Sequence, residues 1–334
     1  YRSEYNAKTK TWSKWSNRGT AKADKSSWVD TKVNHGTYYK YTVRSVNGKN
    51  ISDFKETGAL MFITTPAVKI ANNAAGMKVA WSKVGGATGY TVYRSELKNG
   101  AWTKWKTMGT AKADKSSWVD KSVVSGVEYK YTVRALKNKA VSAFVDSNNV
   151  MFLSQPTVKG ANAANGVNVT WNAVNGAQSY KVYRAVYNAS TKKWSGWSVI
   201  ATATETNYVD ATVASGTYYK YTVRAVNGAN MSTYKASGSL YYLQEPVTTL
   251  TVVENGINVA WTQSAGATGY TVYRSQYDPA TNTWSKWSNR GTAKADKTNW
   301  TDKKTVQGVT YKYAVRAVNG KHKSSFTETT GVTR

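Results

Sequence analysis

The chain is poor in the residues from which most chemical sites are built. Its 334 residues include no cysteine and only two histidines, and Asp plus Glu total 18. The absence of cysteine excludes disulfide scaffolds, cysteine-ligated zinc and iron–sulfur sites, and thiol catalysis. Stability must therefore come from packing.

Long apolar segments are also missing. The longest purely apolar run covers residues 59–63, far short of the ~20 residues that a membrane helix needs. No signal-like segment opens the chain, although an upstream signal or anchor stays open because the sequence does not begin with Met. We expect a soluble segment with no membrane insertion.

Positive charge is abundant. Lys plus Arg total 46, which gives a formal net charge of +28, and the excess is spread over the whole chain. Such a surface attracts polyanions in a salt-dependent way, so anionic cell-wall or host glycans are candidate partners. The alternative is that the charge serves solubility and mutual repulsion. Neither a recognition helix nor an aromatic RNA-binding signature is present, so we expect no specific nucleic-acid recognition.

The sequence repeats itself at a period of about 90 residues. Trp81, Trp171 and Trp261 recur 90 positions apart, and complete copies begin at prolines. The first copy is incomplete, since Tyr1 aligns with Tyr93 and so lacks about a quarter of a unit. We predict four modules and name them repeat 1 (1–65), repeat 2 (66–155), repeat 3 (156–245) and repeat 4 (246–334).

The incomplete first copy predicts an exposed core face and unpaired strand edges. Upstream residues of a longer array are the favoured cover. The alternatives are strands taken from a neighbouring chain, which would make the protein self-assemble, or poor folding of residues 1–65.

Within each repeat the apolar period is two, as in residues 166–171 and 219–224. Alternation of this kind is typical of half-buried strands. Asn-Gly pairs place turns between runs of five to eight residues. We predict all-β units of about seven strands.

The order of these segments resembles fibronectin type III modules, closest to the cysteine-free tandem modules of bacterial extracellular proteins. It runs Val-x-Val-x-Trp, Gly-Ala-x-x-Tyr-x-Val-Tyr-Arg, a Trp-containing hairpin, Val-Asp, and Gly-x-x-Tyr-x-Tyr-x-Val-Arg-Ala. The resemblance implies a tandem array of immunoglobulin-like β-sandwiches in an elongated chain, outside the bacterial cell or on its surface. Trp81, Trp171 and Trp261 would be buried between the sheets. The tyrosine-corner residues would be Tyr39, Tyr129, Tyr219 and Tyr311.

One aspartate precedes each tyrosine corner. These residues are Asp30, Asp120, Asp210 and Asp302. We interpret them as turn-forming carboxylates, because a single carboxylate per unit cannot supply the six to eight oxygens that calcium takes.

No set of residues suits catalysis. His35 and His322 have no counterparts in repeats 2 and 3, the carboxylates form no acid/base pair, and no phosphate-binding glycine loop is present. We expect a non-enzymatic protein without cofactor or metal.

A pair of tryptophans three residues apart is the most distinctive motif of each repeat. Since positions i and i+3 of a strand face opposite sides, we predict that one Trp enters the core rim and the other lies on the outer face. Arginines of the neighbouring strands would stack on the outer indoles and form a rigidifying ladder, or the strip would bind sugars or another copy. The candidate residues are Trp12, Trp15, Trp102, Trp105, Trp194, Trp197, Trp284, Trp287, Arg94, Arg134, Arg184, Arg224, Arg274 and Arg316.

Two functions follow from this sequence. The first is a structural spacer, stalk or filament-forming segment of a secreted or cell-surface bacterial protein, whose partners are neighbouring modules or other copies. The second is an adhesin or an array that binds carbohydrate or anionic polymer through the Trp pairs and the basic surface.

Overall fold

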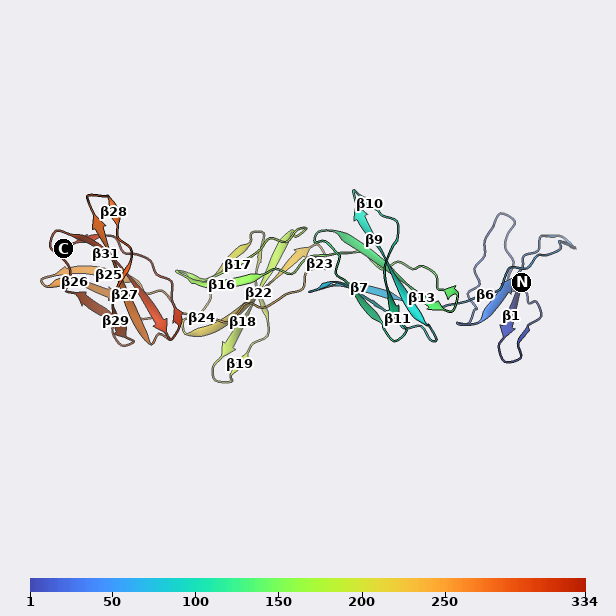
Figure 1. Ribbon diagram of the computed structural model, residues 1–334, viewed down its shortest axis with the longest axis horizontal. Coiled ribbons are helices and arrows are strands. Elements are labelled where there is room, and N and C mark those ends of the chain that lie inside the picture. Colours follow the sequence, from blue (N-terminus) through green and yellow to red (C-terminus); the bar gives the residue numbers. More distant parts are fainter. The chain divides into compact units, whose positions relative to one another are not determined.

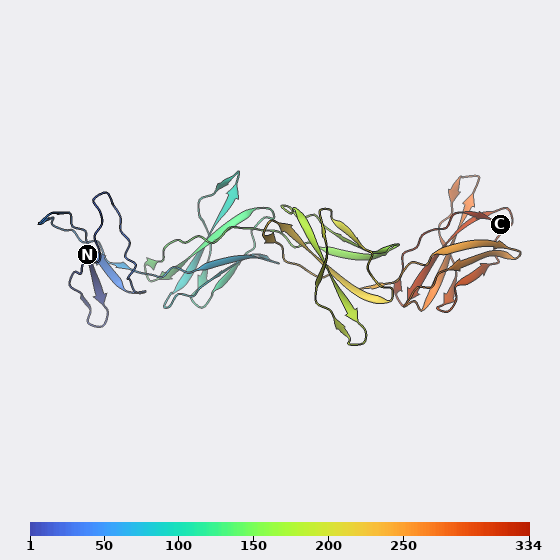
Figure 2. The ribbon, with the colours of Figure 1, turned by 180° about the vertical axis from the view of Figure 1, so that it is seen from behind.

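The computed structural model describes residues 1–334 and contains strands, turns and loops but no helix (Figures 1 and 2). Contacts divide the chain into two compact units, Tyr1–Phe152 and Leu153–Arg334. This division is coarser than the four modules that the repeat predicts, and the boundaries of those modules stay a prediction. The all-β class predicted from the period-two alternation is confirmed.

Repeat 2 folds into two antiparallel sheets. Its strands are β7 (Val68–Asn73), β8 (Gly76–Trp81), β9 (Gly89–Lys98), β10 (Ala101–Trp102), β11 (Lys106–Lys112), β12 (Ser117–Asp120), β13 (Glu128–Lys137), β14 (Ala140–Val141) and β15 (Val150–Met151). One sheet has the order β12-β8-β7, and the other joins β11, β9 and β13 with the short pieces β10, β14 and β15. Because β14 and β15 are two pieces of one last strand and β10 is a hairpin extension, seven main strands remain, as predicted.

Repeats 3 and 4 have the same strand order. In repeat 3 the strands are β16 (Val158–Ala163), β17 (Gly166–Trp171), β18 (Ser179–Asn188), β19 (Lys193–Trp194), β20 (Ser198–Ala203), β21 (Asn207–Asp210), β22 (Thr217–Asn227), β23 (Asn230–Met231) and β24 (Leu240–Tyr242). In repeat 4 they are β25 (Thr248–Val253), β26 (Gly256–Trp261), β27 (Gly269–Asp278), β28 (Thr283–Trp284), β29 (Ser288–Lys294), β30 (Asn299–Asp302), β31 (Thr310–Asn319), β32 (His322–Lys323) and β33 (Val332–Thr333). Each complete repeat opens with a proline two residues before an edge strand, where a missing N–H costs no ladder bond.

Repeat 1 has no counterpart of the three-stranded sheet. Its strands are β1 (Arg2–Asn6), β2 (Thr11–Trp12), β3 (Tyr38–Tyr41), β4 (Val46–Asn47), β5 (Asn50–Ile51) and β6 (Leu60–Met61). Val43, which aligns with the fully buried Val133, is 86% exposed. The inner face of repeat 1 is therefore open to solvent at Val43, just beyond β3, whereas Tyr39 within β3 is 1% exposed.

The core of each complete repeat lies between its two sheets. Trp81, Trp171 and Trp261 are 5–6% exposed, which confirms their predicted burial. In repeat 2 the Trp81 ring lies 5.3 Å from the ring of Tyr90, and both belong to a cluster that includes Val133. Contact between apolar side chains of both sheets is what the alternation of each strand produces.

The four predicted tyrosine corners are also present. The hydroxyl of Tyr129 accepts a hydrogen bond of 2.8 Å from the backbone N–H of Val124, five residues upstream. The equivalent bonds measure 2.7 Å at Tyr39, 2.7 Å at Tyr219 and 3.0 Å at Tyr311. Each bond fixes the loop that precedes the strand carrying the tyrosine, which is β3, β13, β22 or β31.

We expect Tyr129→Phe to lower the stability of repeat 2 by about 1–2 kcal/mol, because the Val124 N–H loses its acceptor. Hydrogen exchange of the β13 and β22 amides measures this change repeat by repeat. Tyr93→Phe is the matched control, since that ring packs on Phe144 and its hydroxyl makes no hydrogen bond in the chain. Equal losses in the two variants would show that the corner hydroxyl contributes nothing specific.

Candidate functional site

Each tryptophan pair lies on a hairpin that extends beyond the main sheet. In repeat 2, β9 turns at Asn99 and Gly100, whose φ angles of 50° and 77° suit a two-residue hairpin. The chain returns as β10, with Trp102 opposite Leu97. Trp105 then falls in the gap before β11 begins at Lys106.

A hydroxyl residue after the first Trp of each pair ties this hairpin to the preceding strand. The Ser285 hydroxyl accepts a 2.9 Å bond from the backbone N–H of Gln276, and the Ser275 hydroxyl donates to the Ser285 carbonyl at 2.6 Å. Thr103 occupies this place in repeat 2 and receives the N–H of Glu96 at 3.1 Å. Sequence reasoning missed this role, although the Trp-Ser spelling was the signal for it.

In repeats 2 and 4, one lysine lies against both tryptophans of the pair. The Nζ of Lys130 lies 4.9 Å from the ring centre of Trp102 and 5.3 Å from that of Trp105, and it pairs with Asp146 at 2.9 Å. Lys312 repeats this arrangement at 4.6 and 5.4 Å from Trp284 and Trp287.

In repeats 1 and 3 the same lysine position faces the first tryptophan of the pair. Lys40 lies 5.0 Å from the ring of Trp12, and Lys220 lies 4.3 Å from that of Trp194. The equivalent second tryptophans, Trp15 and Trp197, are half-buried.

The prediction that the two rings face opposite sides is therefore wrong. It assumed one continuous strand, whereas β10 ends at Trp102 and β11 begins at Lys106. Between the pairs Trp102–Leu97 and Lys106–Arg94 the chain has one residue more than β9, which shifts the alternation. No tryptophan of the pairs belongs to the buried core.

A second cation and a second aromatic ring lie beside the lysine and the tryptophan pair. We call these four groups together the outer ladder. The guanidinium of Arg134 lies 4.6 Å from the ring centre of Phe144, and that ring lies 6.0 Å from Trp105. Arg224 lies over Tyr234 at 5.9 Å and Arg316 over Phe326 at 5.4 Å. These arginines were predicted to stack on indoles. They stack instead on the rings of Phe144, Tyr234 and Phe326. In repeats 2 and 4 the lysine already lies against both indoles.

Arg94, Arg184 and Arg274 are absent from this outer ladder, which corrects a second expectation. Arg94 shares its strand face with the buried Tyr90 and Val92, so the period of two turns it inward. Its Nη1 donates to Asp120 at 2.8 Å, and its guanidinium lies 5.1 Å from the ring of Tyr129. The equivalent distances to Asp210 and Asp302 are both 2.9 Å.

The buried aspartate is the centre of a cross-sheet network. Asp120 accepts hydrogen bonds from the Tyr131 hydroxyl at 2.8 Å, from the Ser122 hydroxyl at 2.6 Å and from the Ser122 N–H at 2.9 Å. The bond from the N–H two residues on confirms the predicted turn role. The ion pair with Arg94 is a further role that sequence reasoning missed.

These contacts change acidities in a defined direction. Burial alone would raise the pKa of Asp120, but the bonds from Ser122, Tyr131 and Arg94 outweigh it and hold that pKa below its usual range. The pKa of Asp210 is lowered by the same balance. Burial and the neighbouring carboxylate raise the pKa of Tyr131 above its usual value.

We therefore expect a plateau of stability between about pH 4 and pH 10. The lowered carboxylate pKa stabilises the fold above the unfolded value of ~3.9, and this contribution is lost as the pH falls through the folded pKa. The raised tyrosine pKa contributes fully below about pH 10 and is lost as the pH rises beyond it. Thermal unfolding from pH 2 to 12 measures the loss of stability at low pH, the acid limb, and at high pH, the alkaline limb.

Asp120→Asn tests the acid limb directly. The variant removes the buried carboxylate and leaves Arg94 only the longer 3.4 Å ion pair with Glu96. We therefore expect a loss of about 3 kcal/mol in repeat 2 on the plateau and a weaker dependence below pH 4. Asp146→Asn is the control, because it breaks an ion pair whose carboxylate is 46% exposed and should cost less than 1 kcal/mol. An unchanged acid limb in Asp120→Asn would contradict this assignment.

The structure contains no cluster of three or more His, Cys, Asp or Glu side chains that could hold a metal ion. It also contains no helix long and apolar enough to cross a membrane.

Comparison with known proteins gives one informative relative. No protein-family model matches the chain. Exoglucanase B of Cellulomonas fimi is 27% identical over 314 residues, which cover 81% of this chain and 26% of that protein. The chain thus spans about a quarter of the length of this curated relative.

Similar solved structures include the FN1–FN3 domains of chicken CNTN1, at 15% identity over 81% of this chain and 98% of that one, with a TM-score of 0.25. A two-domain fibronectin type III segment of chicken tenascin matches at 18% identity over 54% and 99%, with a TM-score of 0.29. The fold itself is established by strand order, by the buried second-strand tryptophan and by the tyrosine corner. The complete repeats are fibronectin type III-like sandwiches.

Proposed function

We propose that this chain is a non-enzymatic spacer segment of a secreted or cell-surface bacterial protein. The observation that carries the proposal is a specific contact between consecutive repeats inside the unit Leu153–Arg334. A spacer needs such contacts, because a flexible joint would not hold a fixed distance.

The contact between repeats 3 and 4 is built on aromatic side chains. His322 of repeat 4 lies against two tyrosines of repeat 3, with ring centres 5.5 Å from Tyr218 and 5.3 Å from Tyr241. The two tyrosine rings are themselves 4.6 Å apart. Aromatic pairs at these distances add directional contact to apolar burial.

Hydrogen bonds surround this aromatic contact. Asn162 of repeat 3 donates to the Lys323 carbonyl at 2.9 Å, and Ser215 donates to the Ala265 carbonyl at 2.6 Å. Asn319 of repeat 4 donates to the Tyr241 hydroxyl at 3.3 Å. Bonds on several sides of one aromatic centre resist both bending and rotation.

The other histidine has a comparable place in the unit Tyr1–Phe152. The N–H of Thr64 donates to Nδ1 of His35, so Nε2 carries the proton that it donates to the Gly85 carbonyl at 2.5 Å. Both histidines of the chain thus lie where one repeat contacts the next, which gives them a structural use.

The relative supports an accessory segment of a longer protein, since the match covers 26% of Exoglucanase B. The resemblance to tandem modules of bacterial extracellular proteins supports the proposed location. The buried aspartates already accept hydrogen bonds from Arg, Tyr and backbone donors. Their carboxylates are therefore not available to a substrate as a general acid or base.

Distance measurements test the spacer. Because the chain has no cysteine, Lys159→Cys with Thr249→Cys places two unique spin labels at equivalent exposed positions of repeats 3 and 4. We expect a single narrow distance distribution, and Tyr218→Ala with His322→Ala should broaden it at least about twofold, because the aromatic contact is lost.

Tyr234→Ala with His35→Ala is the matched control for that pair, since neither residue takes part in the contact between repeats 3 and 4. A broad distribution in the unmodified chain would rule out a rigid spacer.

The second candidate, binding of polymer by the Trp pairs, meets an obstacle in repeats 2 and 4. There a lysine already lies against both indoles and is itself paired with a carboxylate. A sugar ring would have to displace that lysine or use the opposite faces of the indoles.

A further inference from the structure

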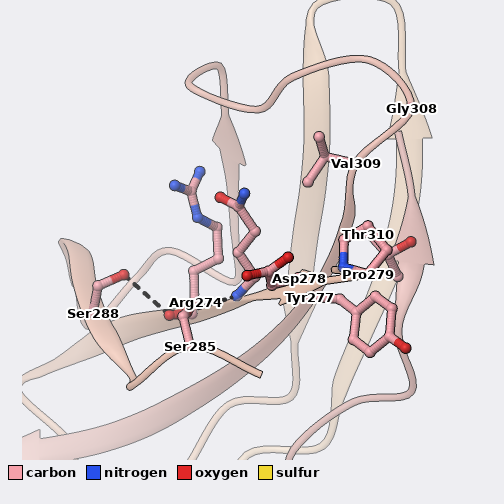
Figure 3. A pocket seen from close by; sticks show the side chains of 10 residues that line it. Arg274, Tyr277, Asp278, Pro279, Ser285, Ser288, Gly308, Val309 and Thr310 are labelled. Carbon is pink, nitrogen blue, oxygen red and sulfur yellow. Dashed lines mark hydrogen bonds between the residues drawn. The ribbon is translucent and has the colours of Figure 1, made fainter. Parts of the chain in front are cut away.

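A polar groove lies beside the hairpin of repeat 4 (Figure 3). Its lining does not include Lys312 or the tryptophans Trp284 and Trp287. Its volume is about 620 Å³. One wall comes from β27 with Arg274, Gln276 and Asp278, and the other from the turn before β31 with Val309 and Thr310. The groove is open along its length, so it suits a segment of an extended ligand better than a small enclosed one.

The same groove occurs in repeat 1, with a volume of about 730 Å³. Its walls use equivalent positions of β1 and of the turn before β3, which are Arg2, Glu4, Asn6, Thr37 and Tyr38. Two serines of the Trp-Ser-Lys-Trp-Ser stretch line the groove in both repeats. A concavity that recurs with the same residue positions is a property of the repeat and not an accident of one loop.

The groove is not the seat of a following module. His35 and Gly36 in repeat 1 already contact the next repeat and the chain that leads to it, through the bonds to Gly85 and Phe62, and the groove beside them is still open. The contact with the next repeat therefore leaves this groove free.

The lining offers both donors and acceptors. The side-chain amide of Gln276 makes no hydrogen bond within the chain, and Asp278 uses only Oδ1, to accept the N–H of Ala280. Arg274 is held in place through Nη1 by Asp302 and by the Lys304 carbonyl. Hydroxyl groups, which both donate and accept, complement such a mixed set.

Charge separates this groove from the rest of the surface. The chain carries +28, but in the groove of repeat 4 the charge of Arg274 is offset by Asp302, and Asp278 adds a carboxylate. A polyanion would gain little there and would meet Asp278. The lining therefore favours an uncharged ligand over an anionic one.

We propose that the grooves of repeats 1 and 4 bind segments of a neutral, hydroxyl-rich polysaccharide. Two weak sites on one chain would hold a polymer more strongly than either site alone. The tryptophan pairs then serve to hold the hairpin that forms the groove wall, as the 5.3 Å contact between Tyr277 and Trp284 indicates.

Calorimetric titration of the full chain at high salt tests this site, with soluble glucomannan, hydroxyethyl cellulose and dextran as neutral probes and heparin as the polyanion. The test variant, Glu4→Ala with Gln276→Ala, removes one polar side chain from each groove. Gln276 is exposed, whereas Glu4 is half-buried and pairs with Arg2 at 3.2 Å. We expect it to weaken binding of at least one neutral polymer about tenfold.

Glu56→Ala with Gln263→Ala makes the same chemical changes in the same repeats outside the grooves and should alter affinity less than about twofold. Three results would overturn the proposal: no binding of any neutral polymer, equal weakening by both double variants, or binding of heparin alone that high salt abolishes. Circular dichroism of each variant excludes unfolding as the cause of a loss.

Discussion

A buried carboxylate holds the two sheets of each complete repeat together. Asp120 ends β12 in the three-stranded sheet, whereas Arg94 and Tyr131, which bind it, lie on β9 and β13 of the other sheet. In a sandwich without cysteine, this polar link crosses the core where a disulfide could otherwise stand. A buried ion pair is costly to break, because the partner that stays behind is an uncompensated charge. The link therefore joins the inner faces of the two sheets.

The outer ladder explains part of the unusual composition. Lys130 and Arg134 both lie on the outer face of β13, and each contacts aromatic rings supplied by the hairpin or by the last strand. Long basic side chains cover aromatic surface with their stems while their charged ends stay near water. Some of the excess positive charge is thus structural, because it is needed to cover a face rich in tryptophan and phenylalanine. The remaining lysines are free to act on solubility or on partners.

Much of the fold could be predicted from period and spacing, since these are local properties of the sequence. The alternation of β13 predicted its buried face, and the resemblance to fibronectin type III modules implied the corner at Tyr129. The arginines show where such reasoning stops. The alternation of β9 places Arg94 on its inner face. Its partner there, Asp120, is 26 residues away in the sequence, and no local pattern indicates the pair. The prediction for the tryptophan pair failed for a different reason. The strand is interrupted between Trp102 and Trp105, and the spacing of i and i+3 does not indicate such an interruption.

The grooves could not be predicted at all, because their walls come from segments about 30 residues apart in the sequence that come together only when the sheet forms. Their proposed use depends on the junctions. When two sites sit on bodies that move independently, binding at one site restrains the other only weakly, and the gain from linkage falls as the accessible distances broaden. Stiff contacts such as that of His322 with Tyr218 and Tyr241 narrow those distances within a unit. Rigid spacing of repeats 3 and 4 and weak binding at the groove of repeat 4 are therefore compatible, since the residues of that contact do not line the groove.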